Sequence, residues 1–391
     1  MRIREIDGLR AIAALAVVAT HYFAWVRFSG AQYGWLGVDL FFVISGFLIT
    51  SILIDLKSNS TYFKTFYARR AFRIFPPYFF VLTIYLVYSL AIHRAGTVGL
   101  WTQYVFYYAS LLFSRTEYNI SLVVSLGLTV LWSLSVEELF YLLWAPAVRF
   151  IDGKRFWALL TGIVIAAPIF RWALHYHAGT EVFTFYCRMD GLAFGSMIAL
   201  IVHAHQNGSA KLIAADRIFD RACLGLGILF LAFFAAAGSD YKNPRIFVLG
   251  VTLADLFFAS LVYYIVRHSG ESSLPLRLFR LRPLRSIGMI SYSLYLVHYP
   301  LLIVARNICA NFHLGRRLNA VSIDAVGISL TLLVAYSMWY GFESYSLRLK
   351  DRMFPSPAKV AKLSSALPSH AQFRQGIPAS AVEHSDCAIT G

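Results

Sequence analysis

Long apolar runs alternate with short polar stretches along most of the chain. Each run holds roughly 17 to 25 mostly apolar residues, the length that a helix needs to cross the hydrocarbon core of a bilayer. The pattern predicts an all-α, polytopic integral membrane protein with about ten transmembrane helices. The predicted spans are residues 6–27, 36–54, 77–93, 127–148, 156–175, 183–204, 222–238, 246–266, 287–308 and 320–342.

Two parts of the chain fit this pattern less well. Residues 98–126 are apolar and aromatic without a clear span, so a re-entrant segment, an interfacial segment and two further crossings stay open. Beyond Met353 the chain is rich in Pro, Ser and Ala, which is typical of disorder. We therefore divide the chain into a transmembrane domain, 1–345, and a disordered cytoplasmic tail, 346–391.

The composition agrees with a membrane protein. Of the 391 residues, 58% are hydrophobic and only 14% are charged, whereas a soluble domain carries about a quarter charged residues. The net charge of +15 does not require a nucleic-acid partner, because Lys and Arg lie between the apolar spans. These basic residues concentrate in segments that are cytoplasmic if the N-terminus is inside, which predicts both termini in the cytoplasm.

The cysteines and the N-terminus add two expected absences. The four cysteines, Cys187, Cys223, Cys309 and Cys387, show no C-x-x-C spacing, so we expect neither a metal site nor a disulfide framework. The first apolar run is long enough to span and lacks the short core and cleavage site of a cleavable signal.

The first span carries an arginine and a histidine, Arg10 and His21. At about 100° per residue, eleven residues make roughly three turns, so both side chains leave one helix face about 16 Å apart. Ionisable groups inside a membrane are costly, which makes this face a candidate functional site. The alternative is a signal anchor in which Arg10 extends to the cytoplasmic surface and His21 lies among the outer headgroups.

Other spans carry charges as well. Glu137 and Glu138 are adjacent, so their side chains point about 100° apart and at most one faces a given cavity. The alternative is an interfacial first turn favoured by the helix dipole. Arg188 and Asp190 are too close in sequence to pair on one helix, and we expect Arg188 to pair with Glu137 or Glu138.

A second histidine, His298, lies in the ninth span two residues before Pro300, which we expect to kink the helix. A buried core histidine with structural hydrogen bonds is the alternative interpretation. For Asp255 and Asp324, single acids in spans eight and ten, we expect a hydrogen bond to a neighbouring helix.

The loop predicted between spans two and three carries Arg70 and Arg73 one turn apart, where both could bind one phosphate group. Positive-inside bias alone also explains such a loop. Together with the outer-leaflet histidines and glutamates, these arginines predict a polar path through the protein. Transfer from a phosphorylated donor inside to a hydroxyl outside requires such a path.

Six motifs occur in order along the chain: Asp7-Gly-Leu-Arg10 with His21, then Gly37–Thr50, Arg69–Tyr78, Trp132–Tyr141, Arg188–Gly195 and Ile290–Pro300. Together they closely resemble the motifs of the membrane acyltransferase 3 family. The resemblance implies a ten-helix inner-membrane protein that O-acylates, most often O-acetylates, surface or secreted carbohydrates with acyl-CoA as donor. Some members carry an extracytoplasmic esterase-like domain, for which this chain leaves no residues, so we expect the membrane-only form.

The resemblance also implies roles for single residues. His21 would accept the proton of a sugar hydroxyl and return it to the leaving thiolate, and a glutamate would orient its ring or stabilise the imidazolium. Glu137 and Glu138 match the acidic motif, and the sequence does not decide which one acts. Arg10, Arg70 and Arg73 match donor-binding positions, while Asp7, Arg188, Asp190 and His298 are expected to support the site.

The predicted function is transfer of an acyl group, most simply acetyl from acetyl-CoA, to a hydroxyl of an exopolysaccharide, O-antigen, lipo-oligosaccharide or related glycan. Acyl-CoA is then a substrate, and no permanently bound cofactor is expected. Two alternatives stay open. One is a transporter or flippase without bond chemistry, although paired broken helices are absent. The other is a two-step relay that holds the acyl group on the protein.

Overall fold

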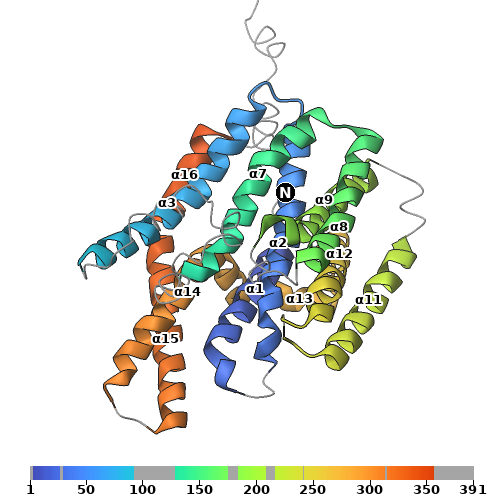
Figure 1. The fold of residues 1–391 in the computed structure, drawn as a ribbon. Coiled ribbons are helices and arrows are strands. Elements are labelled where there is room, and N and C mark those ends of the chain that lie inside the picture. Colours follow the sequence, from blue (N-terminus) through green and yellow to red (C-terminus); the bar gives the residue numbers. More distant parts are fainter. Residues whose placement is uncertain are drawn as a thin grey trace, which may run out of the picture.

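The computed structural model describes residues 3–26, 30–91, 128–174, 184–207, 216–240, 242–312 and 315–355. Within these ranges the chain is almost entirely helical and forms no strand (Figure 1). Residues 98–126 lie outside the described chain, so the question of a re-entrant segment there stays a prediction.

A long helix coincides with each of the ten predicted spans. Eight of the described helices are long and apolar enough to cross a membrane, and α7 and α9 are not among them. The chain is therefore an all-α polytopic membrane protein, as predicted. The helices are α1 (Arg4–Tyr22), α2 (Gly37–Leu56), α3 (Tyr62–Ala91), α7 (Trp132–Phe150), α8 (Gly153–Leu174), α9 (Met189–Gln206), α11 (Asp216–Ala237), α12 (Val251–Arg267), α14 (Arg282–Ala310) and α15 (Arg316–Met338).

Shorter elements extend or join these helices. Short segments of 3-10 helix precede or follow the long helices at η1 (Phe23–Trp25), η2 (Ala31–Leu36), η3 (Leu128–Leu131) and η5 (Phe185–Cys187). Two π-helical turns, η6 (Ile246–Gly250) and η7 (Trp339–Glu343), adjoin α12 and α15, and the remaining short helices are α13 (Leu274–Phe279) and α16 (Ser344–Met353).

Helices α2 and α9 pack closely through a pair of reciprocal glycines. A Cβ atom added to Gly46 of α2 would lie 2.0 Å from the carbonyl oxygen of Leu192, and one added to Gly195 of α9 would lie 2.1 Å from the carbonyl oxygen of Val43. Each glycine thus meets the backbone of the other helix. Small residues at helix crossings are typical of membrane proteins, where close backbone approach supplies much of the association energy.

Helix α1 packs against α2 on one side and α14 on the other. Tyr22, at its end, donates a hydrogen bond to the carbonyl oxygen of His298 at 2.8 Å and shares a second, of 2.9 Å, with the hydroxyl of Thr331. These bonds fix the end of α1 against α14 and α15. Pro300 does not end α14, which continues to Ala310.

Helix α3 corrects one prediction. The segment of Arg70 and Arg73, predicted as a loop before residue 77, lies inside a helix that begins at Tyr62. Pro76 has no N–H to donate to the carbonyl of Phe72, and the hydroxyl of Ser346 donates to that oxygen instead, at 2.6 Å. A side chain from a distant element thus satisfies the carbonyl that Pro76 leaves without its helical donor.

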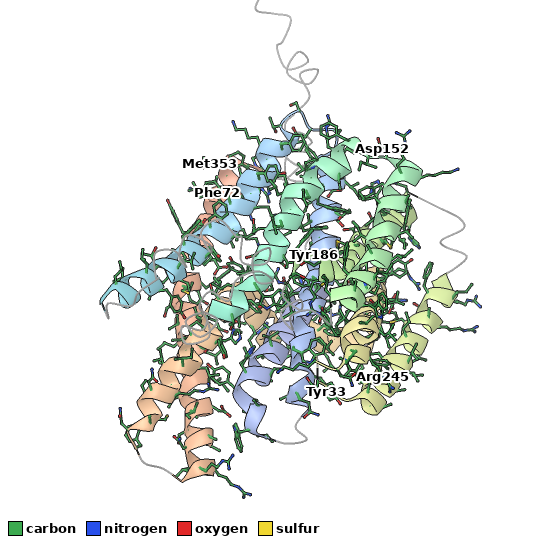
Figure 2. The ribbon with its side chains drawn as sticks, in the orientation of Figure 1. Tyr33, Phe72, Asp152, Tyr186, Arg245 and Met353 are labelled. Atoms are coloured by element: carbon green, nitrogen blue, oxygen red, sulfur yellow. The ribbon has the colours of Figure 1, made fainter. Side chains whose placement is uncertain are left out.

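The donor of that bond lies in α16, which corrects the predicted tail as well. Residues 344–353 are helical and pack on α3, so the tail predicted to begin at residue 346 starts with ordered helix. Residues 356–391 lie outside the described chain. Figure 2 shows Phe72 and Met353 near the same end of the bundle as Asp152, with Tyr33 and Arg245 toward the other end. The predicted orientation makes the first end cytoplasmic.

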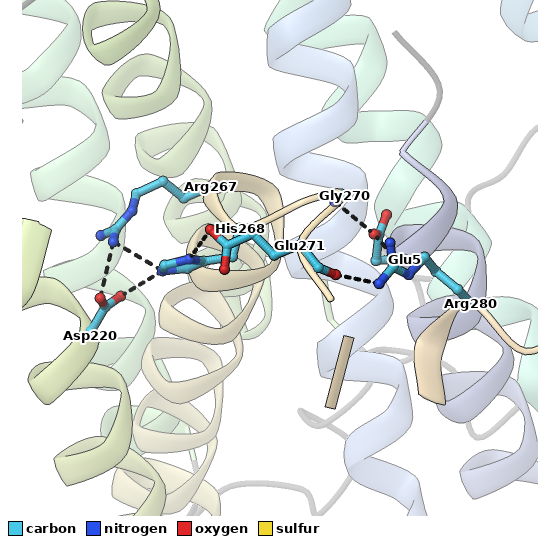
Figure 3. Close-up of polar contacts among 7 residues, drawn as sticks. All are labelled: Glu5, Asp220, Arg267, His268, Gly270, Glu271 and Arg280. Carbon is cyan, nitrogen blue, oxygen red and sulfur yellow. Dashed lines mark hydrogen bonds and ion pairs between the residues drawn. The ribbon is translucent and has the colours of Figure 1, made fainter. Parts of the chain in front are cut away.

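A polar network joins the start of α1 to the first turns of α11 and the end of α12 (Figure 3). The buried carboxylate of Glu5 accepts hydrogen bonds from Ser269 Oγ at 3.1 Å and the Gly270 N–H at 3.2 Å, and Arg280 Nε lies 3.6 Å away. In the same turn, His268 contacts Asp220 of α11 at 3.2 Å. This network anchors the helix that carries Arg10 and His21.

Candidate functional site

Two histidines from distant parts of the chain meet where α1 ends. The ring centroids of His21 on α1 and His298 on α14 lie 5.1 Å apart, and Nδ1 of His21 lies 3.3 Å from Nε2 of His298. His21 Nδ1 also lies 2.8 Å from the carbonyl oxygen of Val17, and His298 Nδ1 lies 2.7 Å from that of Tyr295. The structure therefore places the predicted base beside a predicted supporting residue.

These contacts determine which ring nitrogens carry protons. A carbonyl oxygen only accepts, so Nδ1 of His298 must carry the proton that it donates to Tyr295, and a neutral ring then leaves Nε2 as an acceptor. His21 Nδ1–H donates to Val17 and toward that acceptor. The remaining nitrogen, Nε2 of His21, holds an unshared electron pair, and no hydrogen bond reaches it from the described residues. This arrangement suits a general base.

The surroundings of the pair differ on its two sides. His298 is completely buried, whereas His21 is partly exposed. The ring of Tyr299 meets His21 edge-on at a centroid distance of 4.9 Å. A buried partner and an accessible ring are what a base requires if it is to be held in place and still reach a substrate.

Arg10, Arg70 and Arg73 come together with three glutamates in a second group, which we call the charged cluster. Arg10 donates to the hydroxyl of Ser291 from Nε at 3.3 Å and from Nη2 at 3.1 Å. Arg73 acts electrostatically on both other arginines. The glutamates of the cluster are Glu137, Glu138 and Glu343, each within electrostatic range of at least one of the arginines.

Glu137 is the better held of the two adjacent glutamates. Its Oε1 accepts a hydrogen bond of 2.6 Å from Ser45, and its Oε2 accepts one of 3.1 Å from Tyr141. The charges of Arg10 and Arg70 both act on it. Within the described chain neither glutamate hydrogen-bonds His21, so the expectation that a glutamate orients that ring does not match the geometry. The side chain that contacts the His21 ring nitrogen is His298 instead.

Arg188 and Asp190 belong to a third group, buried between α2, α8, α9 and α12. Arg188 Nη1 lies 3.3 Å from Asp39 Oδ1, so the predicted pairing with Glu137 or Glu138 is wrong. Its guanidinium carbon lies 5.9 Å from the ring centroid of Trp35 and 5.5 Å from that of Trp132. A guanidinium over aromatic faces is stabilised by the ring quadrupoles.

Asp190 pairs with Arg171 of α8 through two hydrogen bonds of 3.0 and 2.7 Å, and both side chains are fully buried. Thr252 adds a bond of 3.0 Å to the same carboxylate. This fork geometry is the strongest form of arginine–carboxylate contact. The group joins α2, α8, α9 and α12 through buried charge pairs, which favours a structural role.

Sequence reasoning missed several residues of these groups. Arg171 is a lone arginine in an apolar span, the same signal that identified Arg10, and could have been found. Ser45, Ser291 and Tyr141 could not, because single hydroxyls in apolar helices are common. Asp324 makes the expected bond to another element, accepting from Trp25 Nε1 at 2.7 Å. Asp7 lies within electrostatic range of Arg10.

Comparison with known proteins places the chain among acyltransferases. The model of a family described as an acyltransferase domain matches residues 3–340. The peptidoglycan O-acetyltransferase OatA of Listeria monocytogenes is 33% identical over 76% of this chain and 49% of its own length. The putative peptidoglycan O-acetyltransferase YrhL of Bacillus subtilis is 28% identical over 77% of this chain and 48% of its own length.

A third relative, the O-acetyltransferase OatA of Staphylococcus aureus, is 28% identical over 76% of this chain and 50% of its own length. The chain thus spans about half the length of these curated relatives. No solved structure matches it. The family match covers the histidine pair and every member of the charged cluster except Glu343, and the chain belongs to this family of membrane acyltransferases.

Proposed function

We propose that the protein is an O-acetyltransferase of the cytoplasmic membrane that moves an acetyl group from acetyl-CoA, bound at the inner side, to a hydroxyl of a glycan at the outer side. The pair of His21 and His298 is the observation that carries this proposal. Family membership and the names of the relatives support the reaction class.

In this mechanism Nε2 of His21 takes the proton of the acceptor hydroxyl. The hydroxyl oxygen attacks the thioester carbonyl, the carbon–sulfur bond breaks, and the same nitrogen returns the proton to the leaving thiolate. While His21 is protonated, its Nδ1–H stays bonded to the Val17 carbonyl and directed toward His298 Nε2. Both acceptors stabilise the transient imidazolium.

The charged cluster has the composition that a nucleotide donor requires. Arg10, Arg70 and Arg73 present guanidinium groups, which bind phosphate oxygens through paired hydrogen bonds. The glutamates offset these charges, and Arg10 donates hydrogen bonds to Ser291. The phosphates of acetyl-CoA would bind here, with the thioester directed along α1 toward His21.

The relatives suggest the first acceptor to test. Two of them carry names that specify peptidoglycan, so glycan strands purified from peptidoglycan, and chitotetraose as a soluble analogue, are the natural probes. Whether exopolysaccharide or O-antigen serves instead is decided by running the same assay with those glycans.

The test uses purified protein in nanodiscs with acetyl-CoA labelled on the acetyl group. We expect label on the glycan and free CoA in equal amounts with the wild type, and a loss of at least about 100-fold with His21→Ala. His203→Gln is the matched control, because His203 is an exposed histidine near the C-terminal end of α9, a helix that carries neither His21 nor His298. Full activity of His21→Ala would remove the base from the mechanism. Glycan uptake into sealed proteoliposomes of the same protein, without CoA release, would indicate a transporter. Label retained on the protein with donor alone would indicate the two-step relay.

A further inference from the structure

The outer end of α1 carries a tryptophan that neither the proposed proton transfer nor donor binding uses. Trp25 follows His21 by four residues, in the 3-10 turn that extends α1. It is 44% exposed, and Phe23 beside it is 36% exposed. A large aromatic face thus lies about one helical turn beyond the proposed base, on the side where the acceptor hydroxyl must enter.

A buried carboxylate fixes this indole. Trp25 Nε1 donates a hydrogen bond of 2.7 Å to Oδ2 of Asp324 on α15, a side chain that is only 5% exposed. A tryptophan of the interfacial belt needs no such partner, because water and lipid headgroups satisfy its N–H. An aspartate inside a span is costly and calls for a function.

Contacts deeper in the protein link this corner to the histidine pair. Tyr22 bonds to the carbonyl oxygen of His298 and to Thr331, seven residues along α15 from Asp324. The charge of Arg306, an exposed residue of α14, acts on both His21 and Asp324. Three elements, η1, α14 and α15, therefore contribute an aromatic face, a carboxylate and a cation to the region where α1 ends.

This combination is suited to a sugar ring. One face of a pyranose presents C–H bonds, which stack on the electron-rich face of an indole, while its hydroxyls donate to carboxylates and accept from cations. We infer that Trp25 and Asp324 form the acceptor subsite, in which a pyranose stacks on the indole and presents a hydroxyl to His21. This inference rests on the proposed function and names its acceptor-binding residues.

The test measures binding separately from catalysis. Titration calorimetry of chitotetraose and of peptidoglycan glycan strands into nanodisc-embedded protein is run on His21→Ala, which removes turnover, and on His21→Ala combined with Trp25→Ala. We expect the dissociation constant of the bound glycan to rise roughly 10- to 100-fold when Trp25 is lost. In the active background, the acceptor KM should rise and kcat should change little.

Three further variants keep the result interpretable. Trp172→Ala is the matched control, because Trp172 is a 63% exposed tryptophan on a different helix, α8. Trp25→Phe retains a stacking face and should keep most of the affinity, whereas Trp25→Leu retains only apolar bulk and should not. Asp324→Asn keeps an acceptor for the indole N–H and should weaken glycan binding less than Asp324→Ala.

The outcomes separate the two proposals. Equal glycan affinity with and without Trp25 overturns the subsite, and so does an equal effect of Trp172→Ala, which would indicate a general belt function. Wild-type protein that binds neither glycan also overturns it. Glycan binding that depends on Trp25, in a protein that transfers no acetyl group, would support the subsite and refute the proposed reaction.

Discussion

His298 influences the proposed reaction without touching the substrate. Its Nε2 is the acceptor toward which His21 Nδ1–H is directed, so it keeps the proton on Nδ1 and the electron pair on Nε2. The Val17 carbonyl supports the same tautomer, which means that loss of His298 weakens the arrangement without abolishing it.

We expect His298→Phe to lower kcat about 10- to 100-fold, the effect of losing a hydrogen bond to a charged group, with little change in either KM. His298→Gln offers an amide oxygen at a similar position and should retain more activity. Steady-state kinetics on both variants check this. Equal kcat values for Phe and Gln would show that only the volume of the ring matters.

The two adjacent glutamates can be told apart by their contacts. Glu137 has two hydrogen bonds and two neighbouring arginines, whereas no hydrogen bond joins Glu138 to the described residues. We expect Glu137→Gln to raise the KM for acetyl-CoA at least about tenfold, because the guanidinium groups lose the charge that positions them. Glu138→Gln should change it less than threefold. Kinetics with acetyl-CoA as the varied substrate decide, and the reverse order would assign the role to Glu138.

At the scale of elements, the crossing of α2 and α9 depends on two reciprocal glycines. Gly46→Ala would place a methyl group 2.0 Å from a backbone oxygen that cannot move without its helix. We expect a loss of about 1–3 kcal/mol in stability, measured as a lower thermal midpoint in detergent.

Gly162→Ala on α8 is the matched control, because nothing lies within 4 Å of the added carbon. It should leave the midpoint unchanged or raise it slightly, since alanine favours helix. Equal thermal midpoints for the two variants would show that α2 and α9 can move apart enough to accept the methyl group without loss of stability.

The sequence was a good guide to the elements and a poor guide to their contacts. Apolar runs mark helices because each run must satisfy its backbone within itself in lipid. The start of α3 was missed because Arg69, Arg70 and Arg73 look like a polar loop, although one-turn spacing also fits a helix. The shared face of Arg10 and His21 followed from helical geometry alone.

The sequence pattern gave no comparable indication of which side chains meet between helices. The partner of His21 is 277 residues away, and Arg188 pairs with an aspartate of α2 rather than with the expected glutamates. Periodicity within one helix tells which residues share a face but not which helix lies opposite. Pairings across the bundle therefore needed the structure.

At the scale of the molecule, Arg171 and Asp190 hold α8 against α9 in the interior. Removing one partner leaves a buried charge without compensation. We expect Arg171→Met to cost about 3–5 kcal/mol, with a large fall in thermal midpoint and in yield.

The double variant Arg171→Met, Asp190→Leu should recover much of that loss, because two apolar side chains of similar size replace the pair. Thermal unfolding of both variants in one detergent checks this. A double variant as unstable as the single one would show that the hydrogen bond from Thr252 to Asp190, or another contact of Asp190, is required for stability.

The unbroken helix α1 limits which acyl donors can reach both Arg10 and His21. Neither glycine nor proline interrupts the helix between Arg10 and His21, so no hinge can shorten the roughly 16 Å that separates them. The helix therefore fixes the distance that the donor must span. A thioester held by its phosphates near Arg10 must present its carbonyl carbon to His21 through a linker of matching length. A truncated donor without the phosphate-bearing end, such as S-acetyl-N-acetylcysteamine, therefore loses its binding to the arginines.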